Sequence, residues 1–325
     1  MPSPLEHLYR FIVPSLERVA PERARELQHL IDELEVTFVF DDISPKMVFK
    51  SDHADNSIKI GLRALERLWV RAYAYIYLYE HITKLQLEDV TARDFDLTKD
   101  PNLANAMTLL AWAVDVERRL TEAGEHGDPG DVNWPCCYPR PPISPPAGSL
   151  ENAADELFLC ALAAVLHHEM GHLARKHDPR DLPQRDHLII KPEEDPAQIE
   201  ADRINTAREK EADAWSAEWL LDGLDPSDDR FLKRIIGTSL GYLWSATRSI
   251  HTGYWLSNNH PPSWDRLYQN LKQYVHTDTH PIWLFVAYIL QLHLQAIGED
   301  PTVNEVECGE QWVNVLLDMV SKAKR

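Results

Sequence analysis

The stretch LHHEMGHL at residues 166–173 decides how the chain is interpreted, because it lies at the end of a long apolar segment. Apolar residues recur through 150–177 at helical spacing, which predicts one buried helix over that range. Residues four apart lie on the same face of a helix. We therefore expect His168 and His172 to present two imidazole nitrogens side by side.

Two imidazoles at this spacing, with a glutamate directly after the first, form the pattern HExxH and indicate a metal site. His168 and His172 would be zinc ligands, and the Glu169 carboxylate would reach a water on the same side as a general base. The alternative is a solvated helix end with unrelated histidines. Burial favours the metal, because unpartnered polar groups inside a protein carry a large desolvation cost.

A catalytic zinc needs a third protein ligand and one open position. His177 lies five residues after His172, and Arg175 stands where the extended pattern HExxHxxGxxH has glycine, so that pattern is absent. A second helix is expected over 198–221, where Glu209 and Asp213 share a face and Glu211 points roughly to the opposite side. Glu209 is the candidate ligand, and Asp213 is expected to orient a ligand histidine by hydrogen bonding. A charged helix face without a metal is the alternative.

The order HExxH then ExxAD, here 209–213, is similar to a zinc peptidase group that includes the HtpX-like heat-shock peptidases and the CaaX prenyl proteases. The resemblance implies a gluzincin-type site in which Glu209 is the third zinc ligand. The segment NHPPSWDRL at 259–267 resembles the downstream HPPxxxR segment of that group. It implies that His260 lies near the metal, as a contact or an oxyanion stabiliser, and that Arg266 is structural. A loop role for His260 stays open.

Those families usually carry clear membrane spans, and no span is expected here. Two soluble families resemble the chain better in overall form. One is the Lit-type phage-exclusion peptidases, which carry HExxH. The other is the ImmA/IrrE-type metallopeptidases that cleave repressors, to which residues 209–221, EKEADAWSAEWLL, are loosely similar. The resemblances cover residues 150–267.

The amino-acid composition argues against some classes of binding partner and favours one cellular compartment. The 325 residues carry 33 Lys+Arg against 52 Asp+Glu, a net charge of −19, which argues against nucleic acid and against a polybasic membrane surface. Four cysteines with no CxxC pair, and an N-terminus without an apolar signal core, favour the cytoplasm. The apolar run at 281–298 is interpreted as a buried helix, because a membrane span needs about 20 apolar residues.

The rest of the pattern predicts a mainly α protein with a small β-sheet and a zincin-like active-site helix pair. Alternating residues at 36–40, with short apolar runs at 47–49 and 58–60, indicate the sheet. We expect a helical region with short strands at 1–123, a proline-rich loop at 124–148 and a helical zinc-peptidase region at 149–325. Further helices are expected at 62–87, 103–120, 231–255, 264–275, 282–297 and 303–323.

The function expected from these residues is a soluble, zinc-dependent endopeptidase that acts on a specific protein substrate. Glu169 would activate water and then protonate the leaving amine, and His260, Tyr242 or Tyr254 would stabilise the oxyanion. The substrate would bind extended along an edge strand of the small sheet.

Regulation is expected, because an uncontrolled cytoplasmic protease is hazardous. The proline-rich loop could cover the cleft, Cys136 or Cys137 could cap the zinc, and a regulatory protein or peptide could activate the enzyme. Phage defence or a stress response would be the setting. The alternative is a non-catalytic, metal-binding interaction protein of the ImmA/IrrE type.

Overall fold

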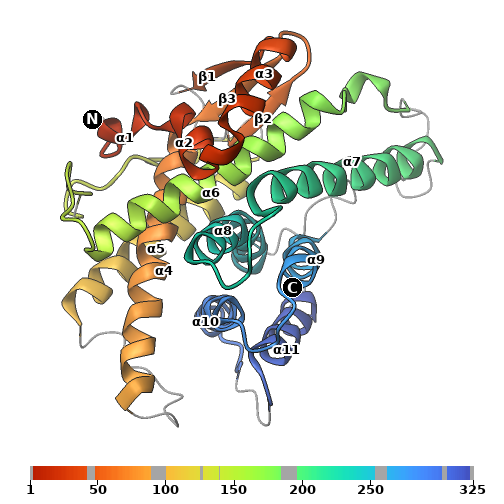
Figure 1. The fold of residues 1–325 in the computed structure, drawn as a ribbon. Coiled ribbons are helices and arrows are strands. Elements are labelled where there is room, and N and C mark those ends of the chain that lie inside the picture. The colour runs from red at the N-terminus through yellow and green to blue at the C-terminus, as the bar shows by residue number, and fades with distance from the viewer. Residues whose placement is uncertain are drawn as a thin grey trace.

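Helices make up most of the molecule, and a small sheet lies at one side of them (Figure 1). The computed structural model describes residues 3–41, 48–88, 100–124, 127–138, 140–183, 196–252, 262–301 and 306–322. The prediction of a mainly α protein with a small sheet is confirmed. The elements described are α1 (Glu6–Tyr9), α2 (Ile12–Val19), α3 (Ala24–Leu34), β1 (Thr37–Asp41), β2 (Phe49–Asp52), β3 (Ser57–Gly61), α4 (Leu62–Glu88), α5 (Pro101–Glu122), α6 (Leu150–Ala174), α7 (Pro196–Leu221), α8 (Asp229–Thr252), α9 (Ser263–Tyr274), α10 (Pro281–Ala296) and α11 (Gly309–Lys322).

The sheet has the strand order β1-β3-β2. Among the described residues, β2 is therefore an edge strand that pairs with β3 alone. β1 runs parallel to β3, and β2 runs antiparallel to it with Phe49 opposite Ile60 and Ser51 opposite Ile58. Its core-facing residues Ile58 and Ile60 are fully buried, and β2 lies against α6. The sheet therefore places an edge strand beside the helix that carries the HExxH pattern.

Helix α6 crosses the middle of the molecule, and α2, α4, α7 and α8 pack around it. Its first turn is capped by Ser149, whose hydroxyl accepts the Asn152 amide at 3.2 Å. Among the described residues, α6 is the one helix long and apolar enough to cross a membrane by length and composition, and 67% of its apolar window is buried inside the fold. α10 is buried as expected from the sequence.

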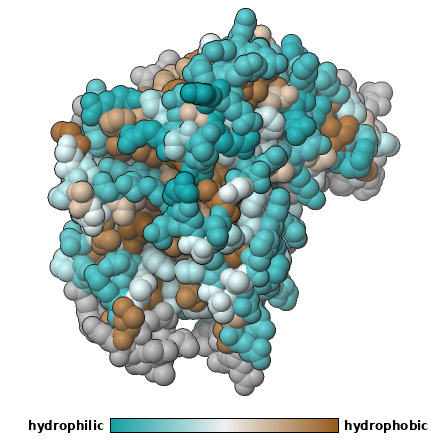
Figure 2. Space-filling model, viewed as in Figure 1, coloured by the Kyte–Doolittle hydropathy of each residue, from teal (hydrophilic) through white to brown (hydrophobic). Residues whose placement is uncertain are grey.

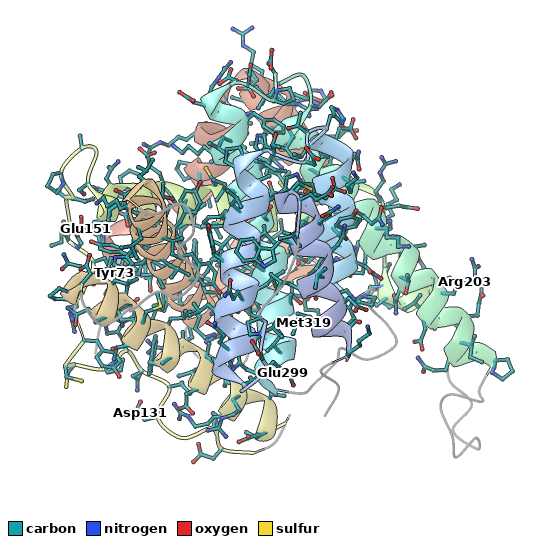
Figure 3. The ribbon with its side chains drawn as sticks, turned by 90° about the horizontal axis from the view of Figure 1, so that it is seen from below. Tyr73, Asp131, Glu151, Arg203, Glu299 and Met319 are labelled. Carbon is teal, nitrogen blue, oxygen red and sulfur yellow. The ribbon has the colours of Figure 1, made fainter. Side chains whose placement is uncertain are left out.

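The hydrophobic core joins both ends of the chain. One cluster of buried side chains includes Leu5 and Leu16 from the N-terminal helices and Val313 and Leu317 from α11. The three-part division of the chain stays a prediction. Hydrophilic residues cover most of the face in Figure 2, in keeping with the net charge of −19. The view from below shows the N-terminal half of α7, with Arg203, projecting from the body (Figure 3).

Candidate metal centre

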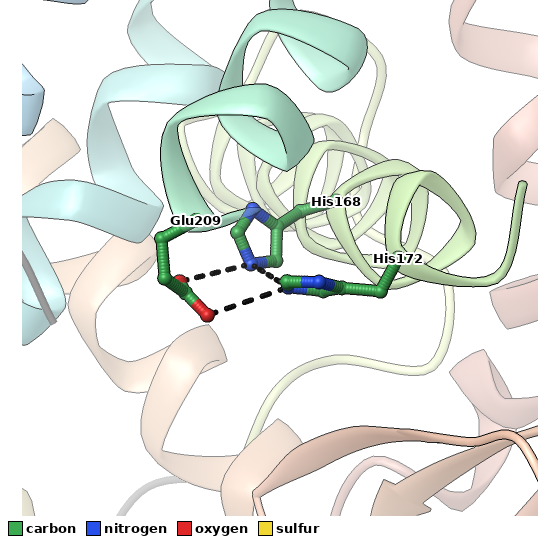
Figure 4. A group of neighbouring side chains, drawn as sticks. All are labelled: His168, His172 and Glu209. Atoms are coloured by element: carbon green, nitrogen blue, oxygen red, sulfur yellow. Dashed lines mark hydrogen bonds and ion pairs between the residues drawn. The ribbon is translucent and has the colours of Figure 1, made fainter. Parts of the chain in front are cut away.

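Three side chains from two helices converge at one point (Figure 4). His168 Nε2 and His172 Nε2 of α6 lie 3.2 Å apart. Glu209 of α7 places Oε2 3.5 Å from His168 Nε2 and Oε1 3.4 Å from His172 Nε2. The sequence prediction that Glu209 joins the two histidines therefore agrees with their positions. Among the described residues, this is the one group of at least three His, Cys, Asp or Glu side chains close enough to hold a metal ion.

The two helices approach closely because small residues lie between the converging side chains. A Cβ atom added at Gly171 would lie 3.1 Å from the Trp215 side chain and 3.2 Å from the Ala212 Cα. Ala212 is fully buried, and one turn further on the Ser216 hydroxyl donates to the Ala164 carbonyl at 2.7 Å. This contact brings the carboxylate of Glu209 within reach of both imidazoles.

Asp213 contacts the ring nitrogen of His168 that faces away from the cluster. Its Oδ1 lies 3.0 Å from His168 Nδ1, so the Nδ1 proton is donated to Asp213 and Nε2 keeps its lone pair. Arg266 of α9 donates two hydrogen bonds of 2.6 Å to the same carboxylate, and its Nη1 lies 3.3 Å from Glu209 Oε2. Burial opposes ionisation of Asp213, but the charges and hydrogen bonds of Arg266 and His168 together outweigh it and lower the pKa of Asp213.

The second histidine has its own partner, which the sequence interpretation missed. His172 Nδ1 lies 3.0 Å from His177 Nδ1, and His177 Nε2 lies 3.0 Å from Glu211 Oε2. A carboxylate accepts, so His177 donates from Nε2 and accepts at Nδ1 from His172. Burial lowers the pKa of His177, which keeps this imidazole neutral. His172 is therefore also left with its Nε2 lone pair facing the cluster.

The chain turns back to make this contact. Lys176 has a left-handed φ of 56°, its amide bonds the Leu173 carbonyl at 3.1 Å, and the His177 amide bonds the His172 carbonyl at 3.0 Å. These two bonds form a Schellman motif at the end of α6. The motif folds His177 over the last turn of the helix, one turn beyond the histidine that it orients.

The donor set fits a divalent cation. Two imidazole lone pairs and a carboxylate directed at one another repel unless a positive charge lies between them. Three ligand atoms on a tetrahedral zinc at about 2.0–2.1 Å would be roughly 3.3–3.4 Å apart. The observed separations of 3.2, 3.4 and 3.5 Å match that geometry. Burial disfavours a charged His168, but the Asp213 and Glu209 carboxylates outweigh it and raise the pKa of His168 to about 10. In the metal-free protein this imidazole therefore carries a second proton, on Nε2, which a bound metal would displace.

Glu169 lies beside the cluster and contacts the sheet. The Ser51 amide of β2 donates to Glu169 Oε2 at 2.7 Å. The Val48 carbonyl accepts a hydrogen bond from the Gly61 amide, so the peptide groups of Val48 face β3. In an antiparallel pair, alternate residues face the neighbouring strand. The amide and carbonyl groups of Phe49 and Ser51 therefore point away from β3, toward the open edge of the sheet. The edge strand thus fixes one oxygen of the carboxylate and leaves the other for a further partner.

A cavity of about 230 Å³ adjoins His168 and Glu169. Tyr242 lines this cavity, and its role as an oxyanion contact stays a prediction. His260 and Tyr254 lie outside the described residues, so their predicted roles stay predictions.

The proline-rich loop packs against α4 and α5 through Trp134. Trp134 packs against Trp69 of α4 and Trp112 of α5, with ring centroids 6.0 and 5.4 Å apart. Cys136 and Cys137 are exposed free thiols, and neither belongs to the ligand cluster. Occlusion of the cleft by this loop stays a prediction.

Comparison with known proteins places the chain in a family. The sequence profile described as Peptidase U49 matches residues 58–286, more than half of the chain. The chain belongs to the Peptidase U49 family. It is also 24% identical over 329 residues to a protein of Escherichia coli (strain K12) named "Cell death peptidase", and the alignment covers 100% of this chain and 99% of the relative. No solved structure matches the chain.

Family membership confirms the prediction of a peptidase, a hydrolase that acts on a protein or peptide. The E. coli relative also supports the resemblance to peptidases of the Lit type. The matched range begins in β3 and ends in α10, so it contains both helices of the metal centre.

Proposed function

We propose that the protein is a zinc-dependent endopeptidase whose metal is held by His168, His172 and Glu209. The observation that carries the proposal is the convergence of two imidazole nitrogens and a carboxylate within 3.2–3.5 Å of one another. Two histidines and a glutamate are a donor set of catalytic zinc in peptidases. When bound, zinc would polarise the scissile carbonyl and lower the pKa of a water.

The chain's own residues carry the proton transfers. Ser51 holds Oε2 of Glu169 through its amide, which orients the other oxygen to take a proton from water. Glu169 then delivers that proton to the amine that leaves when the peptide bond breaks. Asp213 and His177 keep the two histidine rings in the tautomer that presents Nε2. His260 remains a proposed oxyanion contact.

The biological setting proposed is controlled cleavage of one specific protein in the cytoplasm, under a regulatory protein or peptide. Support comes from the E. coli relative, whose name assigns it to cell death. A setting in phage defence or a stress response is consistent with that name.

The test is Glu169→Gln, which keeps the shape of the side chain but removes the base. Purified full-length protein is loaded with zinc, its metal content is measured, and hydrolysis of a peptide library from a proteome digest is followed by mass spectrometry. Wild type should cleave, and Glu169→Gln should bind zinc but lose about 100-fold or more in rate. The matched control is Glu156→Gln, an exposed position on the same helix that should retain the wild-type rate. Equal rates for wild type and Glu169→Gln would contradict the proposal. No cleavage by wild type would favour a non-catalytic binding protein.

A further inference from the structure

The cavity beside the candidate metal centre is lined by α6, α8 and the edge strand β2, with further residues from α7 and α9. Its volume is about 230 Å³, and the ligand His168 and the base Glu169 form part of its wall. An apolar cavity of about 150 Å³ is large enough to hold benzene. The space therefore accommodates an aromatic side chain directly next to the reacting groups.

Part of the wall away from the metal is apolar. Phe49 of β2 and Trp244 of α8 meet edge to face, with ring centroids 6.1 Å apart, and both line the cavity. Val165 of α6 and Gly241 of α8 lie in the wall between the two helices. A side chain that enters would be surrounded by aromatic and aliphatic carbon, which favours burial of apolar surface.

The polar side chains in the wall have partners within the fold. The Thr238 hydroxyl donates to the Arg234 carbonyl at 2.9 Å, and the Ser245 and Ser263 hydroxyls lie 2.6 Å apart. Asp213 is paired with Arg266, as described above. A polar substrate side chain would lose its bonds to water and meet groups that are already bonded, and such burial is costly. The lining thus disfavours neutral polar residues, although the Arg248 guanidinium, which donates to Thr121 Oγ1 at 3.4 Å, also lies in the wall.

The edge strand indicates how a peptide would reach the cavity. The Ser51 amide contacts the base Glu169. Phe49 lies two residues earlier on β2, and its peptide groups point to the same open edge of the sheet. The ring of Phe49 lines the cavity. An extended peptide lying along that edge would place its scissile bond near Glu169. A neighbouring side chain would then face the cavity, because strand addition sets side chains against fixed pockets.

We infer that this cavity is the specificity pocket of the peptidase and takes one large apolar side chain, best an aromatic one, adjacent to the scissile bond. The inference rests on the proposed function and adds the substrate class to it. It predicts that the same side of the scissile bond carries the apolar residue in every cleaved peptide.

Gly241→Val is the variant that tests the pocket. A Cβ atom at Gly241 would lie 3.5 Å from Val165 Cγ2, an ordinary contact, and Gly241 lines the cavity, so the larger side chain of valine should take up part of its volume. Valine is also a better helix former than glycine, so folding should be retained. The matched control is Lys233→Val, at an exposed position of the same helix outside the cavity.

Two measurements are made on the full-length, zinc-loaded protein. The first compares kcat/KM for matched peptides with Phe or Ala at the position that faces the cavity, chosen from the library cleavage sites. Wild type and Lys233→Val should prefer Phe, and Gly241→Val should lower the Phe-to-Ala ratio about 10-fold or more while the Ala peptide is still cleaved. The second measures binding of N-acetylphenylalanine amide by saturation-transfer NMR, which needs no turnover and should be lost in Gly241→Val alone.

The outcomes separate the two proposals. Cleavage without an apolar preference, or with a preference unchanged in Gly241→Val, would overturn the pocket and leave the peptidase standing. Binding of the amide equally to wild type and Gly241→Val would also overturn the pocket. Absence of cleavage combined with Gly241-dependent binding of the amide would support an apolar pocket and count against the peptidase.

Discussion

Replacing Asp213 with asparagine should weaken zinc binding and destabilise the fold at the same time. The Asp213 carboxylate accepts from His168 Nδ1 at 3.0 Å and from Arg266 through two bonds of 2.6 Å, and it is buried. Asparagine keeps the shape but has one acceptor oxygen instead of two, and its amino group would face a donor. Oδ1 accepts from both His168 Nδ1 and Arg266 Nη2, so an asparagine that keeps this oxygen loses the Arg266 Nε bond to Oδ2 and offers His168 a neutral amide oxygen in place of a carboxylate.

The expected magnitudes follow from those contacts. Loss of a carboxylate that orients a ligand histidine typically costs about 10- to 100-fold in metal affinity. Loss of one partner of a buried ion pair costs about 3–5 kcal/mol of stability. Glu209 still lies 3.3 Å from Arg266 and offsets part of its charge, so the lower end, about 3 kcal/mol, is expected here.

Zinc affinity is measured by competition with a chromophoric chelator, and the free energy of unfolding by urea denaturation of the metal-free protein. The control is Glu218→Gln, an exposed carboxylate on α7 outside the cluster, which should change either quantity by less than about 0.5 kcal/mol. If Asp213→Asn binds zinc as tightly as the wild type, Asp213 does not orient His168, and the reasoning from this contact is refuted.

Three further substitutions probe other contacts. His177→Phe removes the acceptor of His172, so zinc affinity should fall about 10-fold or more in the same competition assay, and an unchanged affinity would contradict the role of His177. Gly171→Val would press on Trp215 and should lower stability by about 1–3 kcal/mol in urea denaturation, and a neutral effect would show that α6 and α7 are not tightly apposed there. Burial and the nearby Arg71 lower the pKa of His251 in α8 to about 4. The unfolded chain therefore binds this proton more readily, and the stability present above about pH 6.5 should be lost as the pH falls toward 4, by about 2 kcal/mol at pH 5. Urea denaturation at pH 7.5 and at pH 5 gives the loss in the free energy of unfolding between the two pH values. This loss should be about 2 kcal/mol smaller in His251→Gln than in the wild type. Equal losses in the two proteins would contradict the shifted pKa.

The local part of the site could be predicted from the sequence. The spacing of His168 and His172 places both rings on one face of any helix, and the apolar run before them predicts burial. The position of Glu209 needed one more assumption, that a second helix returns to the first. Ala212, beside the acidic pair, is fully buried and allows that close contact, whereas Ala214 is exposed.

The supporting contacts could not be predicted, because they depend on turns and register. His177 reaches His172 through a left-handed residue that is usually glycine and here is Lys176, so no residue type at this position indicated the motif. β2 was expected at 47–49 and is observed at Phe49–Asp52, which moves Ser51 into the strand and its amide onto Glu169. The last helix was expected from 303 and is described from Gly309.

The most direct test of the metal centre is X-ray absorption spectroscopy of the full-length protein after zinc loading and removal of excess metal. Two imidazole nitrogens, the Glu209 carboxylate and a water predict one zinc per chain with nitrogen and oxygen neighbours at about 2.0–2.1 Å. A chain that retains no zinc, or a zinc with sulfur at about 2.3 Å, would contradict a centre built from His168, His172 and Glu209.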